Sequence, residues 1–163
     1  MKEQVVSLTL HNDCSETVLA VDVARWVEEQ SPWRLFNTAG YSWNVEGKEI
    51  YFLKKNLNLY LLPDASGFIC IENSHVPNNC TLLDAHGQER LRLTVPWQLA
   101  TLNSHASDAP PAYFVSTSTP YLNPADGQPG QFGVKAWVEF GGEYYFELDW
   151  RTGEFLWGRE IRF

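Results

Sequence analysis

Short segments of alternating polarity, separated by turns that end in glycine, constrain this chain more than any other feature. The segments include "EIYFLK", "LNLYLL", "GFICIEN" and "ERLRLTV". They are rich in β-branched and aromatic residues, which favour the pleated surface of a sheet. Each segment has turn-forming residues on both sides. The pattern therefore predicts a succession of short β-strands.

Three similar turns punctuate these strands, at residues 44–47, 64–67 and 84–87, and they start twenty residues apart. Each begins with Asn or Asp, whose side chain accepts hydrogen bonds from backbone amides two residues on, and each ends with glycine. A phosphate-binding loop would need more glycine, a Lys-Ser/Thr ending and a following helix. The spacing instead predicts the turns of a β-meander, with no ligand of their own.

The chain of 163 residues suits one domain with one sizeable core. We expect a mainly β fold over residues 1–163, as a single antiparallel meander sheet or a partly closed barrel. At most one short helix is expected, near residues 15–30. In that segment, polar residues recur at seven-residue intervals and favour a helix, whereas Thr17, Val18, Val21 and Val23 favour a strand.

The charge balance limits the partners of the chain. It carries 20 acidic and 12 basic residues, a formal charge of −8. Nucleic acid and anionic membranes repel such a chain, and a basic protein partner is favoured. The odd cysteine count, with no export signal and no stretch of transmembrane length, predicts a cytoplasmic protein with free, mostly buried thiols at Cys14, Cys70 and Cys80.

The stretch "FGVKAWVEFGGEYYFELDW" predicts a hairpin whose loop length decides which side chains share a face. A three-residue loop at 140–142 pairs Trp137 with Tyr145 and separates apolar from polar positions. One face then carries the candidate partner-binding residues Trp137, Tyr145, Glu139, Glu143, Glu147 and Asp149. Aromatic anchors within a charged rim are typical of a protein interface. The alternative is that a loop or a second sheet covers this face.

Motifs for catalysis and metal binding are missing from the sequence. It holds no His-Glu-x-x-His, Cys-x-x-Cys or Gly-x-Ser-x-Gly. We therefore expect a non-catalytic protein without cofactor or metal. A second hypothesis is a small-molecule-binding β-barrel with a mouth lined by Trp26, Trp33, Tyr41, Trp43 and the loop 119–131. A third is a hydrolase that uses the carboxylates of residues 143–149.

Two long loops, 101–112 and 119–131, are rich in Pro, Gly, Asn and Asp. They exceed what a hairpin needs, and the sequence leaves open whether they are functional.

The closing stretch "YYFELDWRTGEFLWGREIRF", together with small size and acidity, resembles the small acidic immunity proteins with which bacteria neutralise toxins. The resemblance implies a cytosolic protein that binds a cognate toxin domain and blocks its active site or substrate path. It implies no role for any individual residue.

Overall fold

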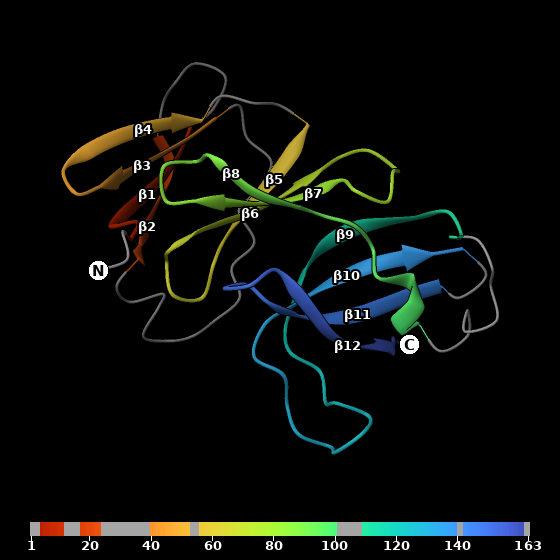
Figure 1. Ribbon diagram of the computed structural model, residues 1–163. Coiled ribbons are helices and arrows are strands. Elements are labelled where there is room, and N and C mark those ends of the chain that lie inside the picture. Colours follow the sequence, from red (N-terminus) through yellow and green to blue (C-terminus); the bar gives the residue numbers. More distant parts are fainter. Residues whose placement is uncertain are drawn as a thin grey trace. The chain divides into compact units, whose positions relative to one another are not determined.

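A computed structural model describes residues 4–11, 17–23, 40–52, 56–100, 109–139 and 142–161. These residues form twelve strands in three four-stranded antiparallel sheets (Figure 1). The prediction of a mainly β fold is confirmed. The strands divide among three sheets, where we expected one.

The sheets follow the sequence closely. The first has the order β2-β1-β3-β4, with β1 Ser7–His11, β2 Thr17–Asp22, β3 Gly40–Val45 and β4 Lys48–Phe52. The second runs β5 Leu57–Leu61, β6 Gly67–Glu72, β7 Cys80–Asp84 and β8 Glu89–Leu93. The third contains β9 Ala112–Ser118, β10 Gly133–Val138, β11 Gly142–Asp149 and β12 Glu154–Glu160. A short 3-10 helix, η1 Trp97–Leu99, follows β8. The second and third sheets are meanders, and the turn spacing predicted this for the second.

The segment with two competing patterns is a strand in its first half. Residues Thr17–Asp22 form β2, which pairs antiparallel with β1 so that Leu8 lies opposite Val21. Its β-branched residues suit a strand, and ladder hydrogen bonds to β1 pair one side of its backbone. Residues 17–22 are therefore strand, which agrees with the expectation of at most one short helix near residues 15–30. Residues 24–30 lie outside the described part of the chain.

The chain divides into two compact units, residues 1–73 with 81–91 and residues 74–80 with 92–163. A core of buried apolar side chains fills the first unit, and Trp43 lies within it. The Trp43 ring lies 4.4 Å from the Phe68 ring, and its Nε1 donates a hydrogen bond to the carbonyl oxygen of Ala85. The extension of one domain over residues 1–163 stays a prediction.

The turns at 44–47 and 84–87 have the predicted chemistry at their glycines. Gly47 and Gly87 both adopt positive φ, 80° and 79°, where a Cβ atom is disfavoured. The backbone amide of His86 donates to Oδ1 of Asp84 over 2.9 Å. These two segments connect β3 with β4 and β7 with β8, and their assignment as turns is confirmed.

The turn at 64–67 uses its glycine for a different reason. Asp64 accepts a hydrogen bond from the amide of Ser66 over 3.0 Å, as expected. The positive φ falls on Ala65, at 59°, and not on Gly67. A Cβ atom on Gly67 would overlap the carbonyl oxygen of Leu83 in β7. Gly67 is therefore required because β6 approaches the backbone of β7 closely.

The expectation of buried thiols is confirmed for the two cysteines that the structure describes. Cys70 and Cys80 are buried and take part in no disulfide, and Cys14 lies outside the described residues. Within the described ranges, no helix has the length and apolar character needed to cross a membrane.

Candidate protein-binding face

The register of the β10–β11 hairpin decides which side chains the third sheet presents. Trp137 pairs with Glu143, and Val138 pairs with Gly142. This register is two residues away from the predicted pairing of Trp137 with Tyr145. Because side chains alternate with a period of two, a two-residue slip keeps every side chain on its predicted face. The partition into faces is thus confirmed, and the individual pairs are wrong.

One face of this hairpin belongs to the core of the second unit. It carries the buried side chains of Val134, Ala136, Val138, Tyr144, Phe146 and Leu148. Phe146 packs edge-on against Phe155 of β12, with ring centroids 6.2 Å apart. All of the candidate binding residues on the two strands therefore lie on the opposite face.

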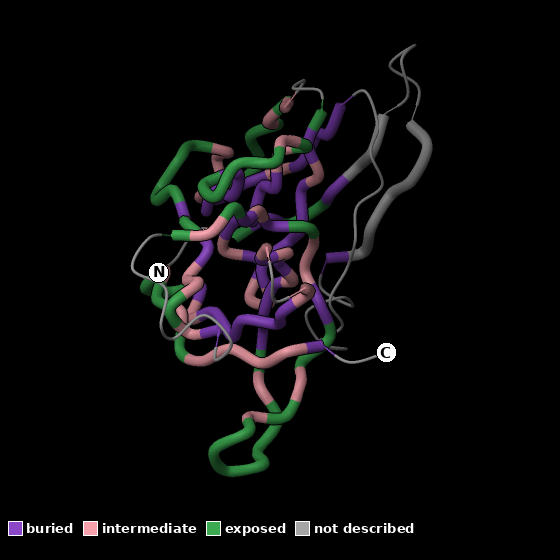
Figure 2. Tube along the Cα trace, turned by 90° about the vertical axis from the view of Figure 1, so that its right-hand side faces the viewer, coloured by how far each residue is buried: buried purple, intermediate pink, exposed green. Residues whose placement is uncertain are grey.

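That opposite face is half covered. Tyr145 is 0% exposed and Glu147 is 5% exposed, so the expectation that both face a partner is wrong. The loop 119–131, here named the covering loop, lies over them, and the ring of Tyr121 is 5.0 Å from that of Tyr145. Figure 2 shows that the covering loop is itself largely exposed. The covering by a loop, the alternative left open by the sequence, applies to this half.

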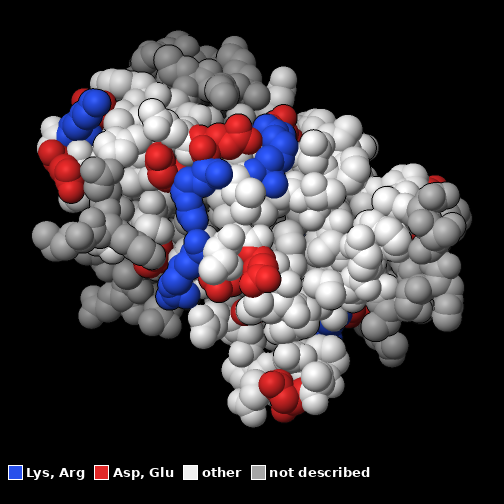
Figure 3. All heavy atoms as spheres, viewed as in Figure 1, with Lys and Arg blue, Asp and Glu red and all other residues white. Residues whose placement is uncertain are grey.

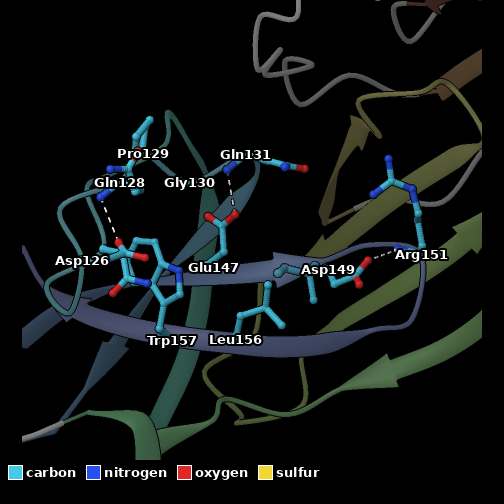
Figure 4. Close-up of a pocket in the computed structure, with 12 residues that line it drawn as sticks. Asp126, Gln128, Pro129, Gly130, Gln131, Glu147, Asp149, Arg151, Leu156 and Trp157 are labelled. Carbon is cyan, nitrogen blue, oxygen red and sulfur yellow. Dashed lines mark hydrogen bonds between the residues drawn. The ribbon is translucent and has the colours of Figure 1, made fainter.

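Glu147 fastens the covering loop to the sheet. Its carboxylate accepts a hydrogen bond from the amide of Gln131 over 2.7 Å (Figure 4). It also accepts from the amide of Phe132, over 3.4 Å, and from the hydroxyl of Tyr145. A Cβ atom on Gly130 would overlap this carboxylate. A buried carboxylate with three donors is held in place, so Glu147 serves the architecture of the loop.

A second glycine makes room for the ring above the sheet. A Cβ atom on Gly133 would overlap the ring of Tyr145, which therefore lies against the bare backbone of β10. Arg159 of β12 also holds the covering loop, because its Nη1 donates a hydrogen bond to the carbonyl oxygen of Leu122 over 2.9 Å. Three strands of the sheet thus position the covering loop.

Tyr145 should make stability fall at alkaline pH. Burial, and then the hydrogen bond to the negatively charged Glu147, raise the pKa of Tyr145 above its ordinary value of 10.0. The folded state then keeps a proton that the unfolded state loses. The contribution is fully present below pH 10, and the free energy of unfolding falls above it by up to about 1.4 kcal/mol per pH unit.

Urea unfolding of the wild type and Tyr145→Phe, from neutral pH to about pH 11, measures this contribution. At neutral pH the variant should be less stable by about 1–3 kcal/mol, because Glu147 loses a donor. The difference should shrink as the pH rises above 10. A difference that stays constant through the alkaline range would contradict the assignment.

The other half of the face is open and aromatic. Trp137 is partly exposed, and its ring stacks on that of Tyr113 in β9 at a centroid distance of 5.5 Å. Tyr113 stacks in turn on His75, at 4.2 Å and an interplanar angle of 10°. These three residues are here named the aromatic row. Glu143 lies opposite Trp137, and Glu139 follows one residue after β10.

Sequence reasoning missed two of the three members of the aromatic row. Tyr113 could have been found, because "AYFVSTS" reads as a strand and its pairing with β10 places Tyr113 opposite Trp137. No local signal identifies His75, which comes from the connection between β6 and β7. Its neighbour Val76 is 44% exposed, so apolar surface continues beyond the row.

The pocket of the second hypothesis is filled in the part that the structure describes. Tyr41 and Trp43 are buried in the core of the first unit, and do not line a mouth. Their assignment as pocket residues is wrong, because aromatic packing with Phe52 and Phe68 occupies the space beside Trp43. Trp26 and Trp33 lie outside the described residues.

The carboxylates that the hydrolase hypothesis would use lie in three different environments. Glu143 lies beside the aromatic row, Glu147 is buried under the covering loop, and Asp149 is partly exposed at the end of β11. Oδ1 of Asp149 accepts a hydrogen bond from the amide of Arg151 over 3.0 Å. Within the described ranges, no group of three or more His, Cys, Asp or Glu side chains is placed to hold a metal ion.

Comparison with known proteins supports the fold. No protein-family model matches the sequence, and no curated protein sequence does. A chain in the structure of Tne2 in complex with Tni2 is similar in fold, with a TM-score of 0.62 at 12% sequence identity. The match covers 97% of this chain and 99% of that chain, so the likeness extends over nearly the full length of both.

Proposed function

We propose that the chain is a non-catalytic, protein-binding module of the immunity type, which binds a basic toxin domain and blocks it. The observation that carries this proposal is the open aromatic row with two glutamates beside it. Tryptophan and tyrosine anchors within a polar rim supply most of the binding energy in protein interfaces.

Stacking prepares the row for binding. Because Trp137, Tyr113 and His75 support one another, their rings are already ordered, and little side-chain entropy remains to be lost. The row crosses strands of a sheet whose other face is core, so the platform is rigid. A partner can dock on it without first rearranging this chain.

The choice of partner follows from charge and from fold. Glu139 and Glu143 lie beside the row, and the whole chain carries a charge of −8, which attracts a basic protein. The similar chain comes from a two-protein complex, which supports a protein partner in general. The resemblance of the closing strands to acidic immunity proteins favours a toxin domain over other basic proteins.

Site-specific photo-crosslinking tests the proposal. A photoreactive amino acid replaces Trp137 in the full chain, expressed in the cells that carry its gene, and the adduct is identified by mass spectrometry. We expect a basic protein whose expression alone arrests growth, and whose toxicity this chain suppresses. The control places the same amino acid at Tyr51 of β4, which is 61% exposed. Equal capture at both positions, or a captured protein that is harmless, would overturn the proposal.

A further inference from the structure

A pocket lies between the covering loop and strands β11 and β12, apart from the aromatic row. Its volume is about 400 Å³, near the lower end of the range for ligand pockets. Asn123, Asp126 and residues 128–131 form one wall. Glu147, Asp149, Leu156 and Trp157 form much of the rest (Figure 4). This size suits one side chain or one small molecule.

Negative charge predominates among the residues that line the pocket. Three carboxylates, Asp126, Glu147 and Asp149, contribute to the lining, against a single guanidinium, that of Arg151. The Arg151 guanidinium lies over the ring of Trp150 at 4.3 Å, and Figure 4 shows this side chain directed away from Trp157 and Asp126. An anion would therefore meet repulsion in the pocket, and a cation would be attracted.

In Asp126 and Asp149, one carboxylate oxygen accepts a hydrogen bond within a turn, and the other oxygen does not take part in that bond. Oδ1 of Asp126 accepts a hydrogen bond from the backbone amide of Gln128 over 2.9 Å, and Oδ1 of Asp149 accepts one from the backbone amide of Arg151. The Oδ2 atoms take no part in these bonds. Asp126 is on the exposed covering loop, which carries an acidic side chain near its tip (Figure 3), and Asp149 is on the sheet. The pocket thus has acceptors on two opposite sides.

Trp157 adds an aromatic wall. It is partly exposed, it lines the pocket, and its ring lies 5.3 Å from that of Tyr145, so the buried tyrosine orients it. The face of an indole attracts cations, and it attracts the planar guanidinium most often. Pro129 and Leu156 supply apolar surface for an aliphatic stem.

We propose that this pocket receives an arginine side chain of the protein partner, stacked on Trp157 and bonded to Asp126, while Asp149 at the other end of the pocket adds to the attraction for its charge. The inference rests on the proposed function, because the basic partner supplies the arginine. It adds a charged anchor, on the far side of Tyr145 from Trp137, to the aromatic anchor of the row.

The test uses the free full-length chain and N-acetyl-L-arginine amide as the probe. The indole N–H signal of Trp157 is assigned by comparison with Trp157→Phe and followed by NMR during titration. We expect a saturable shift of this signal. N-acetyl-L-citrulline amide, the uncharged counterpart, should bind at least about tenfold more weakly.

Variants identify the acceptors. Asp126→Asn and Asp149→Asn keep the turn-forming Oδ1 atom and remove the charge. The first should weaken binding of the arginine probe by about tenfold, and the second should weaken it less. Glu46→Gln removes the same charge from the exposed β3–β4 turn and should leave binding unchanged. No saturable shift, equal binding of the citrulline probe, or unaffected binding by both Asn variants would each overturn the proposal. Crosslinking at position 137 is scored separately, so either proposal can fail alone.

Discussion

Replacement of Gly67 by alanine is expected to lower the free energy of unfolding by about 3 kcal/mol or more, although only one methyl group is added. The new Cβ atom would overlap the carbonyl oxygen of Leu83, and it would also meet the backbone carbon of Asp84 at 3.0 Å. Backbone atoms of a hydrogen-bonded strand cannot rotate out of the way as a side chain can. The strands β6 and β7 must therefore separate, and the buried residues around Phe68 lose contacts.

Gly47→Ala is the matched control. Gly47 has a φ of 80°, but a Cβ atom there would meet nothing within 4 Å. Only the cost of a left-handed backbone applies, about 1–2 kcal/mol. Urea unfolding of both variants, monitored by circular dichroism, separates the two effects. If Gly67→Ala were no less stable than Gly47→Ala, the close approach of β6 to β7 would not be the reason for this glycine.

The contrast between these two glycines shows what the turn pattern could predict. An Asx-x-x-Gly pattern reports local hydrogen bonding and φ, and it located all three turns. The requirement at Gly67 comes from Leu83, which is sixteen residues away in the sequence. A local pattern carries no information about a neighbouring strand, so the physical reason had to come from the structure.

The number of sheets could not be predicted from the sequence, for a related reason. Alternation and turn spacing determine that consecutive strands pair, and in the second and third sheets they do. Where one sheet ends and the next begins depends on which strand edges remain unpaired. At the edge of the third sheet, the backbone of Phe114 in β9 exchanges hydrogen bonds with the side chain of Asn79, the residue before β7. No pattern in the sequence around Asn79 predicts that its side chain pairs with the edge of β9.

The candidate face was predictable in its composition and not in its exposure. Alternation places Trp137, Tyr145 and Glu147 on one face in any register of the correct parity. Whether a side chain on that face reaches solvent depends on the covering loop. Two glycines allow this covering, because Gly130 of the loop lies against the carboxylate of Glu147 and Gly133 of β10 lies against the ring of Tyr145, where a Cβ atom would overlap them. Periodicity of apolar residues cannot report a contact made by the absence of a side chain.

Truncation of Trp137 to alanine is expected to weaken binding of the crosslinked partner by about 2–4 kcal/mol while the fold is retained. The truncation removes the end ring of the aromatic row and its contacts with the partner, and it leaves Tyr113 stacked on His75 alone. Partial exposure of Trp137 keeps the cost in unfolding free energy smaller than the cost in binding. Isothermal titration calorimetry measures the change in binding free energy, and urea unfolding measures the change in the free energy of unfolding.

Charge reversal on the same face should act on a different quantity. Glu139→Lys with Glu143→Lys should mainly slow association and flatten its dependence on salt, because charges at the rim steer the encounter more than they hold the complex. Trp137→Ala should instead raise the dissociation rate. Tyr51→Ala, at an exposed aromatic residue of β4, should alter neither rate. If Trp137→Ala and the charge reversal both left the two rates unchanged, the aromatic row would not be where the partner docks, and the proposed interface would be wrong.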